Sequence, residues 1–297
     1  MAAPVVAQSR ELLGVIFVYQ HGIPEDMLPF LHLPSSLHPS ERDIRLYQTA
    51  LSPWYLRFPL SRLHLLFALV PRMRSIVAQE AISSGNMTLL CHLHKMDDLA
   101  TFPVPLIDTA ARFNQVDILS FLQRIPNYDR HGYTIKAAFD AALFGHLECV
   151  QFLVHNDLVR FEMLRLTMEH AARGGHLHII TWLLESPAAL ANMPIDWMRI
   201  INAASIGGHF EIVKFACIRL EVDSPCYRQA MWNAARHCHF PLVEFLMARQ
   251  DKSIDAAEIY RRSVKLYLDN SPPGAPAPST MIHDREFVQV QRGNNNH

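Results

Sequence analysis

Cysteine is scarce in this chain, and long apolar runs are missing. The 297 residues include five cysteines, an odd number scattered along the sequence, which argues against a disulfide framework and favours a reducing compartment. No apolar run approaches the ~20 residues that a membrane-spanning helix needs. The apolar residues 12–19 follow Arg10 and Glu11 rather than the basic segment that opens a secretory signal. We therefore expect a cytoplasmic or nuclear protein without a membrane-embedded part.

The chain also has almost no net charge and lacks the common catalytic motifs. Lys and Arg number 27 against 28 Asp and Glu, and the net charge of −1 gives no bulk attraction to nucleic acid or anionic lipid. The phosphate-binding patterns GxGxxG and GxxxxGK, the nucleophile pattern GxSxG and the zinc pattern HExxH do not occur. These absences predict a non-enzyme without a cofactor, whose partner is neither nucleic acid nor a membrane.

One pattern recurs six times in the middle of the chain. Three clear copies read AALFGHLECVQFL, AARGGHLHIITWL and AARHCHFPLVEFL. We number each copy from its first alanine, which is position 1; the six first alanines are Ala81, Ala110, Ala141, Ala171, Ala204 and Ala234. Their spacings of 29, 31, 30, 33 and 30 residues mark a repeat array.

The second half of each copy has the pattern of an amphipathic helix. Positions 7, 10 and 13 are apolar in all six copies, whereas positions 8 and 11 are mostly polar. Position 12 is aromatic in five copies, at Phe121, Phe152, Trp182, Phe215 and Phe245. We expect these aromatic side chains to widen the buried face, as core residues rather than base-stacking platforms for nucleic acid.

A second apolar cluster precedes each alanine pair and predicts a first helix. Between the two helices, position 5 is glycine in four copies, and a residue without Cβ can take the left-handed conformation that ends a helix. Asn114 suits the same place, but Cys238 does not, so we expect a distorted sixth turn. Each helix–turn–helix unit is too small to bury its own apolar face, and its neighbours must cover the rest.

Ala-Ala-x-x-Gly-His followed by an aliphatic helix resembles the ankyrin repeat, and the resemblance covers residues 76–250. It implies an all-α fold, an ankyrin-type helical-hairpin solenoid of about six repeats with helical N- and C-terminal caps. The Thr-Pro-Leu-His opening of the family is absent, and most copies are shorter than the ~33 residues typical of it. We therefore expect short or irregular hairpins between the units.

The segments outside the array have different compositions. Residues 10–75 contain apolar stretches broken by prolines and predict an irregular helical N-terminal cap of short helices after a flexible N-terminus, residues 1–9. Residues 251–270 predict a C-terminal capping helix. Residues 271–297 lack apolar periodicity and predict a disordered tail.

The resemblance also implies a binding site. In ankyrin proteins, position 3 and the residue after it commonly face the concave groove that binds a partner. Carried onto this sequence, the partner-binding residues are Arg112, Phe113, Leu143, Phe144, Arg173, Ile206, Arg236 and His237. Three arginines at position 3 favour an acidic or amphipathic protein segment as the partner. The alternative is that they are solvated cations near a helix C-terminus, worth ~0.3–1 kcal/mol each.

Histidine is abundant, with 17 residues, and four occupy position 6: His146, His176, His209 and His239. Packed helices lie about 8–10 Å apart, whereas zinc needs its ligands at about 2 Å. We therefore predict no metal site, and expect these side chains to tie one turn to the backbone of the next unit. His92 with His94, and His237 with Cys238 and His239, could each offer two ligands, but no second pair follows at zinc-finger spacing.

Together these patterns predict a monomeric, non-catalytic protein–protein interaction scaffold that binds its partner in the groove of the array. The alternative is a substrate-recruiting adaptor of a larger assembly, for example a ubiquitin ligase, that docks through residues 10–75.

Overall fold

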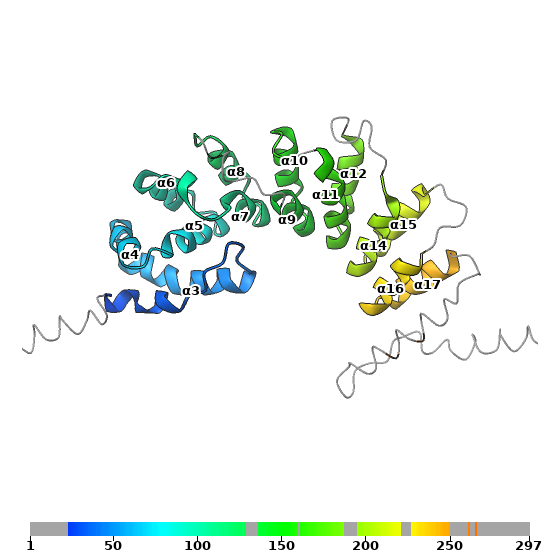
Figure 1. Cartoon of the computed structure of the whole chain (residues 1–297), viewed down its shortest axis with the longest axis horizontal. Coiled ribbons are helices and arrows are strands. Elements are labelled where there is room, and N and C mark those ends of the chain that lie inside the picture. The colour runs from blue at the N-terminus through cyan, green and yellow to red at the C-terminus, as the bar shows by residue number, and fades with distance from the viewer. Residues whose placement is uncertain are drawn as a thin grey trace, which may run out of the picture. The chain divides into compact units, whose positions relative to one another are not determined.

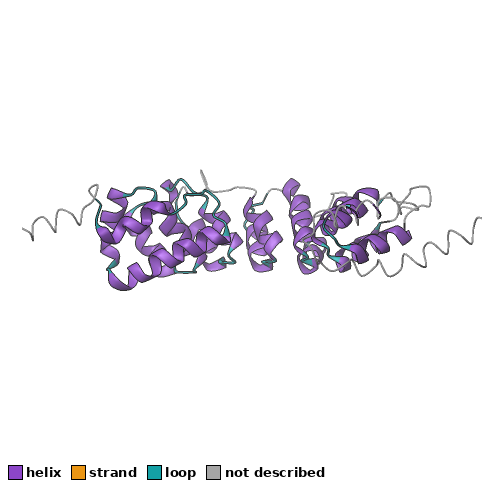
Figure 2. Ribbon diagram, turned by 90° about the horizontal axis from the view of Figure 1, so that it is seen from below, coloured by secondary structure: helices purple, strands orange, loops and turns teal. Residues whose placement is uncertain are grey.

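The regular structure of the chain is entirely helical wherever it is described (Figures 1 and 2). The computed structural model describes residues 23–126, 128, 136–159, 161–186, 195–220, 227–249, 261 and 265. The all-α class expected from the sequence is confirmed for these residues. The predicted N-terminus 1–9 and tail 271–297 lie outside them, as does the capping helix 251–270 except for helical Arg261 and Lys265.

The chain divides into two compact units, residues 1–138 and 139–297, which are called unit 1 and unit 2 below. The boundary falls inside α9 (Lys136–Phe144). The earlier helices are η2 (Glu25–His32), α3 (Glu41–Arg57), η3 (Leu60–Arg62), α4 (Leu63–Leu69), α5 (Met73–Ser83), α6 (Met87–Met96), η4 (Leu99–Thr101), α7 (Leu106–Arg112) and α8 (Val116–Gln123). The later ones are α10 (Leu147–His155), α11 (Phe161–Gly174), α12 (Leu177–Glu185), α14 (Trp197–Gly207), α15 (Phe210–Arg219), α16 (Arg228–Arg236) and α17 (Phe240–Arg249).

Every copy of the repeat forms a pair of helices joined by a tight turn. The pairs are α5 and α6, α7 and α8, α9 and α10, α11 and α12, α14 and α15, and α16 and α17. In all six, the N–H of position 6 donates to the carbonyl of position 1, with N···O distances between 2.7 and 2.9 Å. This bond closes the Schellman turn that ends a helix. First helices pack on first helices, α5 on α7 in unit 1 and α14 on both α11 and α16 in unit 2.

Position 5 is left-handed in all six turns, because the Schellman bond requires a positive φ there. The four glycines have φ between 69° and 87°, and Asn114 has φ 55°. Cys238 has φ 64°, and its N–H donates to the carbonyl of Ala235 at 3.1 Å. The expected distortion of the sixth turn is therefore wrong: the turn keeps its geometry although a side chain there costs about 1–2 kcal/mol.

The buried stripe differs from the one predicted. Positions 1, 2, 9, 10 and 13 are buried in all six copies, whereas position 7 is buried only at Phe240. The position 12 aromatics are half-buried, and two of them contact the second helix of the preceding hairpin. Their ring centroids lie 5.8 Å apart for Phe121 and His94, and 5.8 Å apart for Trp182 and His155.

Part of the predicted N-terminal cap contains a longer helix than its prolines suggested. α3 runs for 17 residues, passes through Pro53 and lies against α5 (Figure 1). A capping box between Ser40 and Asp43 starts it, and the buried side chains of Tyr47 and Trp54 anchor it, so the one hydrogen bond lost at the proline does not end it. Asp26 joins η2 to this helix by accepting from Trp54 Nε1 at 2.9 Å.

Candidate binding faces of the first helices

An extended segment of the chain lies on the first helices of unit 1. We call residues 36–40, which precede α3, the resident segment. Gln79 of α5 is fully buried, and its Nε2 donates to the carbonyl oxygens of Ser36 at 2.9 Å and Leu37 at 3.2 Å. Arg112 of α7 donates from Nη1 to the carbonyl of Pro39 at 3.2 Å. Side chains of two successive first helices thus hold the backbone of a peptide-like segment.

A contact between an imidazole and a carboxylate adds to these backbone contacts. His38 Nδ1 lies 3.8 Å from Oδ2 of Asp108, whose side chain is 2% exposed. Asp108 and Gln79 occupy the same position in their copies, two residues before the first alanine; we call it position −1. Position −1 precedes position 3 by four residues, so both lie on one helix face. We call the surface formed by these two positions the first-helix face.

The first-helix face of unit 1 is therefore occupied by the chain itself. Arg112, predicted to bind a partner, instead donates to Pro39, which is buried. Phe113 is half-buried, with the Arg112 guanidinium carbon 6.0 Å from its ring centroid. Neither residue presents an open surface of the kind that the sequence predicted for them.

A buried acid lies next to this face. Glu80 is 4% exposed and accepts from the Tyr55 hydroxyl at 3.4 Å, which joins α3 to α5. Burial raises the pKa of Glu80, although the hydrogen bonds from Tyr55 and Ser84 oppose the rise. Burial also raises the pKa of Tyr55, and the charge of Glu80 raises it further. The pair is therefore a packed structural contact in which the phenol stays protonated.

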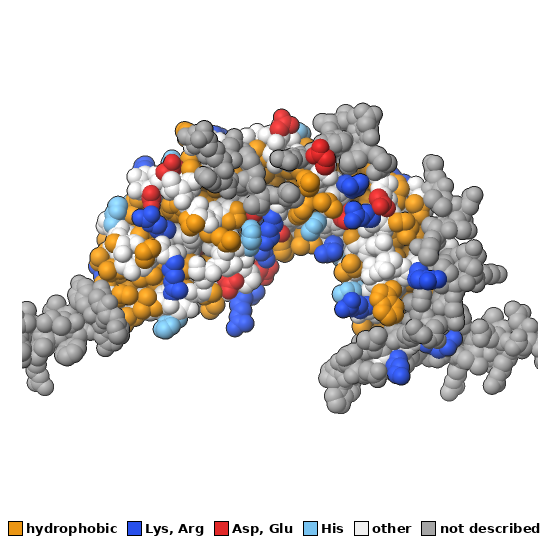
Figure 3. Space-filling model, in the orientation of Figure 1, with side chains coloured by type: hydrophobic (Ala, Val, Ile, Leu, Met, Phe, Trp, Pro, Cys, Tyr) orange, Lys and Arg blue, Asp and Glu red, His pale blue; other side chains and the backbone are white. Residues whose placement is uncertain are grey.

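In unit 2 the predicted residues lie on the first helices or, for His237, directly after one, and several are exposed. Arg173, Arg236 and His237 are exposed, and Phe144 is 37% exposed. Leu143 and Ile206 are half-buried at position 3. Figure 3 shows Lys and Arg side chains over α11 and α14 and an apolar patch over α16.

Three of the position 6 histidines join successive hairpins of unit 2. Three imidazole Nε2 atoms donate to the carbonyl of position 3 in the preceding copy: His176 to Leu143 at 3.0 Å, His209 to Arg173 at 2.9 Å and His239 to Ile206 at 3.2 Å. The prediction that these side chains tie one hairpin to the backbone of another is thus confirmed for three of them. The bond runs to the preceding hairpin, however, and not to the next one. In unit 1, Gln115 takes this place beside Gly85.

Each of these rings lies against the glycine of the preceding turn. A Cβ atom on Gly175 would lie 2.5 Å from Nδ1 of His209, and one on Gly208 would lie 2.5 Å from Cε1 of His239. The glycines are therefore required twice, for the positive φ and for the space that the ring fills.

Position −1 of unit 2 carries polar and aromatic side chains that the repeat pattern did not indicate as functional. Glu169 pairs with Arg199 at 3.2 Å, and burial raises its pKa against the effect of that arginine. Asn202 is half-buried, and its Oδ1 is enclosed without a hydrogen-bond partner among the described residues. Trp232 is 37% exposed. The four-residue spacing from position 3 was the signal that could have found them.

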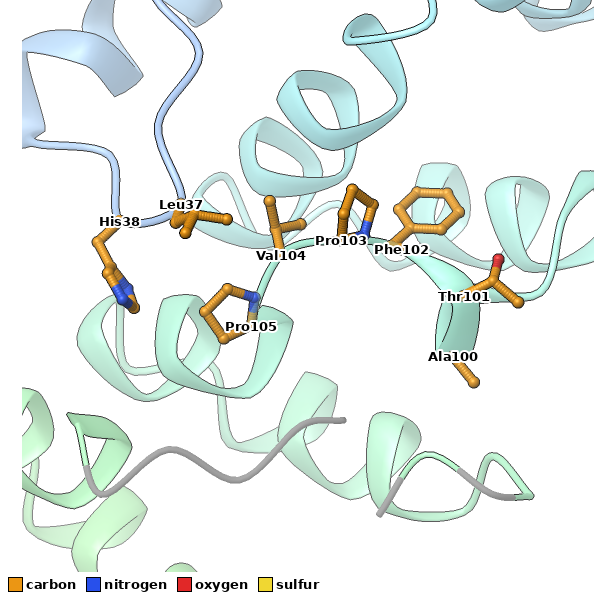
Figure 4. A pocket seen from close by; sticks show the side chains of 8 residues that line it. All are labelled: Leu37, His38, Ala100, Thr101, Phe102, Pro103, Val104 and Pro105. Carbon is orange, nitrogen blue, oxygen red and sulfur yellow. The ribbon is translucent and has the colours of Figure 1, made fainter. Parts of the chain in front are cut away.

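A cavity of about 570 Å³ opens beside the resident segment in unit 1. Leu37 and His38 line one side, and residues 100–105, which connect α6 to α7, line the other (Figure 4). Phe102 is 7% exposed and Val104 is 9% exposed, so the wall of the cavity is largely apolar. The resident segment therefore forms part of a concave surface.

Two absences hold for the part of the chain that the structure describes. No group of three or more His, Cys, Asp or Glu side chains could hold a metal ion there, including the clusters at His92 and His237. No helix in the described ranges combines the length and apolar character needed to cross a membrane.

No family model matches the chain, and no curated protein matches it.

Proposed function

We propose that the protein is a non-catalytic protein-binding scaffold, built as an ankyrin-type stack of helical hairpins, whose first-helix face in unit 2 binds an extended segment of a partner protein. The observation that carries this proposal is the resident segment. In unit 1, residues 36–40 are held across α5 and α7 by side chains at positions −1 and 3. The equivalent positions of unit 2 carry the exposed side chains of Arg173 and Arg236.

The charge of this face favours an acidic partner segment. Arg165, Arg173, Arg199 and Arg236 lie on the first helices of unit 2. Among the described residues, Arg199 is the only one of these four that forms an ion pair, with Glu169. Exposed guanidinium groups can take carboxylates in bidentate geometry, which gives orientation as well as affinity. A few such anchors supply most of the binding energy of a protein interface.

Proximity labelling in the native cell, followed by capture with purified full-length protein, tests the proposal. The double variant Arg173→Glu with Arg236→Glu is expected to reduce capture of the labelled partner at least tenfold, with unchanged helicity by circular dichroism. Lys214→Glu, an exposed charge reversal on α15, is the matched control and should retain capture. Full capture by the double variant would overturn the proposal.

A second candidate function, an adaptor that docks through the N-terminal region, is favoured by exposed apolar side chains there. Leu56 of α3 is 90% exposed, and Leu46 and Leu65 are 44% and 40% exposed. Replacing Leu56 and Leu65 by serine should abolish one interaction while leaving capture by unit 2 intact. If every interaction survives that change, the adaptor function is wrong.

A further inference from the structure

The first-helix face has the same donors on α14 and α16 as on α5 and α7. Position −1 of the earlier helix is an amide in both pairs, Gln79 in α5 and Asn202 in α14. Position 3 of the later helix is arginine in both pairs, Arg112 in α7 and Arg236 in α16. The two side chains that hold the carbonyl groups of the resident segment therefore have counterparts in unit 2.

The amide oxygens of Gln79 and Asn202 are in the same state. Gln79 donates from Nε2, whereas its Oε1 and the Oδ1 of Asn202 are both enclosed and have no hydrogen-bond partner in the described part of the chain. Ser205, fully buried on the same helix, also has an Oγ with no partner among the described residues. The oxygen of Asn202 thus matches that of Gln79, and its Nδ2 is the group that could donate to a carbonyl of a bound segment, as Gln79 Nε2 does.

The pair α11 and α14 does not reproduce this arrangement. Its first position −1 residue is Glu169, a carboxylate that accepts and cannot donate to a carbonyl, and position 3 of its second helix is Ile206. The counterpart of the resident site is therefore specific to α14 and α16, which pack directly on each other.

One difference between the two sites sets the chemistry of the ligand. Where α7 has Asp108 against His38, α16 has Trp232, which is 37% exposed. A carboxylate selects a cationic or hydrogen-bonding side chain, whereas an exposed indole ring selects an apolar or prolyl one. The resident segment itself is extended and contains Pro39, whose fixed φ lowers the entropy lost on binding.

We propose that Asn202, Trp232 and Arg236 form a binding site for an extended, proline-bearing segment of a partner protein. Asn202 and Arg236 donate to two backbone carbonyl groups, and the ring of Trp232 packs against an apolar side chain between them. The proposal rests on the proposed function and names the register and chemistry of the partner segment. Figure 3 shows the apolar patch over α16 next to basic side chains.

The resident sequence supplies a defined probe. A fluorescein-labelled peptide of residues 33–41, LPSSLHPSE, is titrated with the full-length protein in fluorescence anisotropy, together with the same peptide carrying H38L. The H38L peptide is expected to bind about three- to tenfold more tightly. Leucine packs on the indole ring of Trp232, whereas histidine finds no carboxylate there like that of Asp108 in unit 1. Absence of binding by both peptides, or tighter binding of the histidine peptide, overturns the proposal.

Variants locate the site. Trp232→Ala should weaken H38L peptide binding about tenfold, and Trp232→Phe should restore most of it. Asn202→Leu removes the proposed donor with little change in side-chain size and should also weaken binding of the H38L peptide. Ile218→Ala, which truncates a 67% exposed apolar side chain on α15, is the matched control and should leave binding unchanged. Binding that survives Trp232→Ala but is lost in Arg112→Ala would show exchange with the resident segment and overturn the proposal.

Two further outcomes separate this inference from the proposed function. If both peptides fail while Arg173→Glu with Arg236→Glu still abolishes partner capture, the proposed function stands and this site assignment fails. If the protein forms a concentration-dependent dimer that Trp232→Ala abolishes, the site binds a second copy of the chain. The proposal that it binds a segment of another protein is then wrong.

Discussion

The imidazole Nε2 of His209 lies 2.9 Å from the carbonyl oxygen of Arg173. The backbone of an arginine on the candidate binding face is thus fixed by the following hairpin. The same relationship holds one hairpin later, where His239 donates to the carbonyl of Ile206. The hairpin stack and the candidate binding face therefore share residues in unit 2, because the residue whose side chain lies on that face also accepts the hydrogen bond that joins the hairpins.

Removing the His209 side chain should loosen this junction. His209→Ala deletes one hydrogen bond and the ring that fills the space over Gly175, and it should lower the free energy of unfolding by about 1–2 kcal/mol. His209→Gln should lose less, because Gln115 occupies the same place beside Gly85 in unit 1. Urea unfolding followed by circular dichroism measures both. Equal losses in the two variants would mean that the amide does not replace the imidazole.

The repeat pattern predicted this junction better than it predicted the binding face. A left-handed residue at position 5 and a hydrogen-bonding one at position 6 are local requirements, so Gly208 and His209 could be interpreted from the sequence alone. The resident segment could not. Its contacts join residues 43 positions apart, from Ser36 to Gln79, and 73 apart, from Pro39 to Arg112, and no periodicity reports such pairs.

The aromatic residues at position 12 show a second limit of the pattern. Spacing along one helix gives the side of the helix that is apolar, but not which neighbour covers it. Trp182 and Phe121 lie against the second helix of the preceding hairpin and stay half-buried. The fully buried position 9, at Cys149 and Ile179 for example, was left out of the predicted stripe.

The sixth turn should gain stability from glycine. Cys238 has φ 64°, where a side chain is strained, so Cys238→Gly should raise the free energy of unfolding by about 0.5–1 kcal/mol. Asn114→Gly is the matched control in the second turn and should gain less, because asparagine tolerates the left-handed region. Thermal unfolding by calorimetry compares the two. A loss of stability in Cys238→Gly would show that the turn is not strained.

The resident segment should detach when its buried amide is removed. Gln79→Leu leaves the carbonyl groups of Ser36 and Leu37 without their donor, and amide hydrogen exchange in residues 33–41 should become at least about tenfold faster. Gln123→Leu, a change of the same type on α8, is the control and should leave that exchange unchanged. Unaltered exchange in Gln79→Leu would mean that other contacts hold the segment.

Acid should destabilise unit 2 through its stacked histidines. Burial lowers the pKa of His176 from 6.5, more than its hydrogen bond to the Leu143 carbonyl raises it. Burial and the nearby Arg173 also lower the pKa of His170. Because the folded-state pKa lies below the unfolded value, the unfolded chain binds more protons as the pH falls through about 6.5. Stability is therefore fully present above that pH and is lost on acidification.

Urea unfolding midpoints measured between pH 8 and pH 5 test the predicted loss of stability on acidification. The urea midpoint of the wild-type protein should decrease as the pH is lowered. The midpoint of His176→Gln, which keeps a donor for the Leu143 carbonyl but does not titrate, should decrease less steeply. The remaining slope in that variant should decrease again when His170→Gln is added, because that ring is stacked on Phe139 at 4.6 Å and titrates in the same range. An unchanged slope in the double variant would assign the acid sensitivity to groups outside these two histidines.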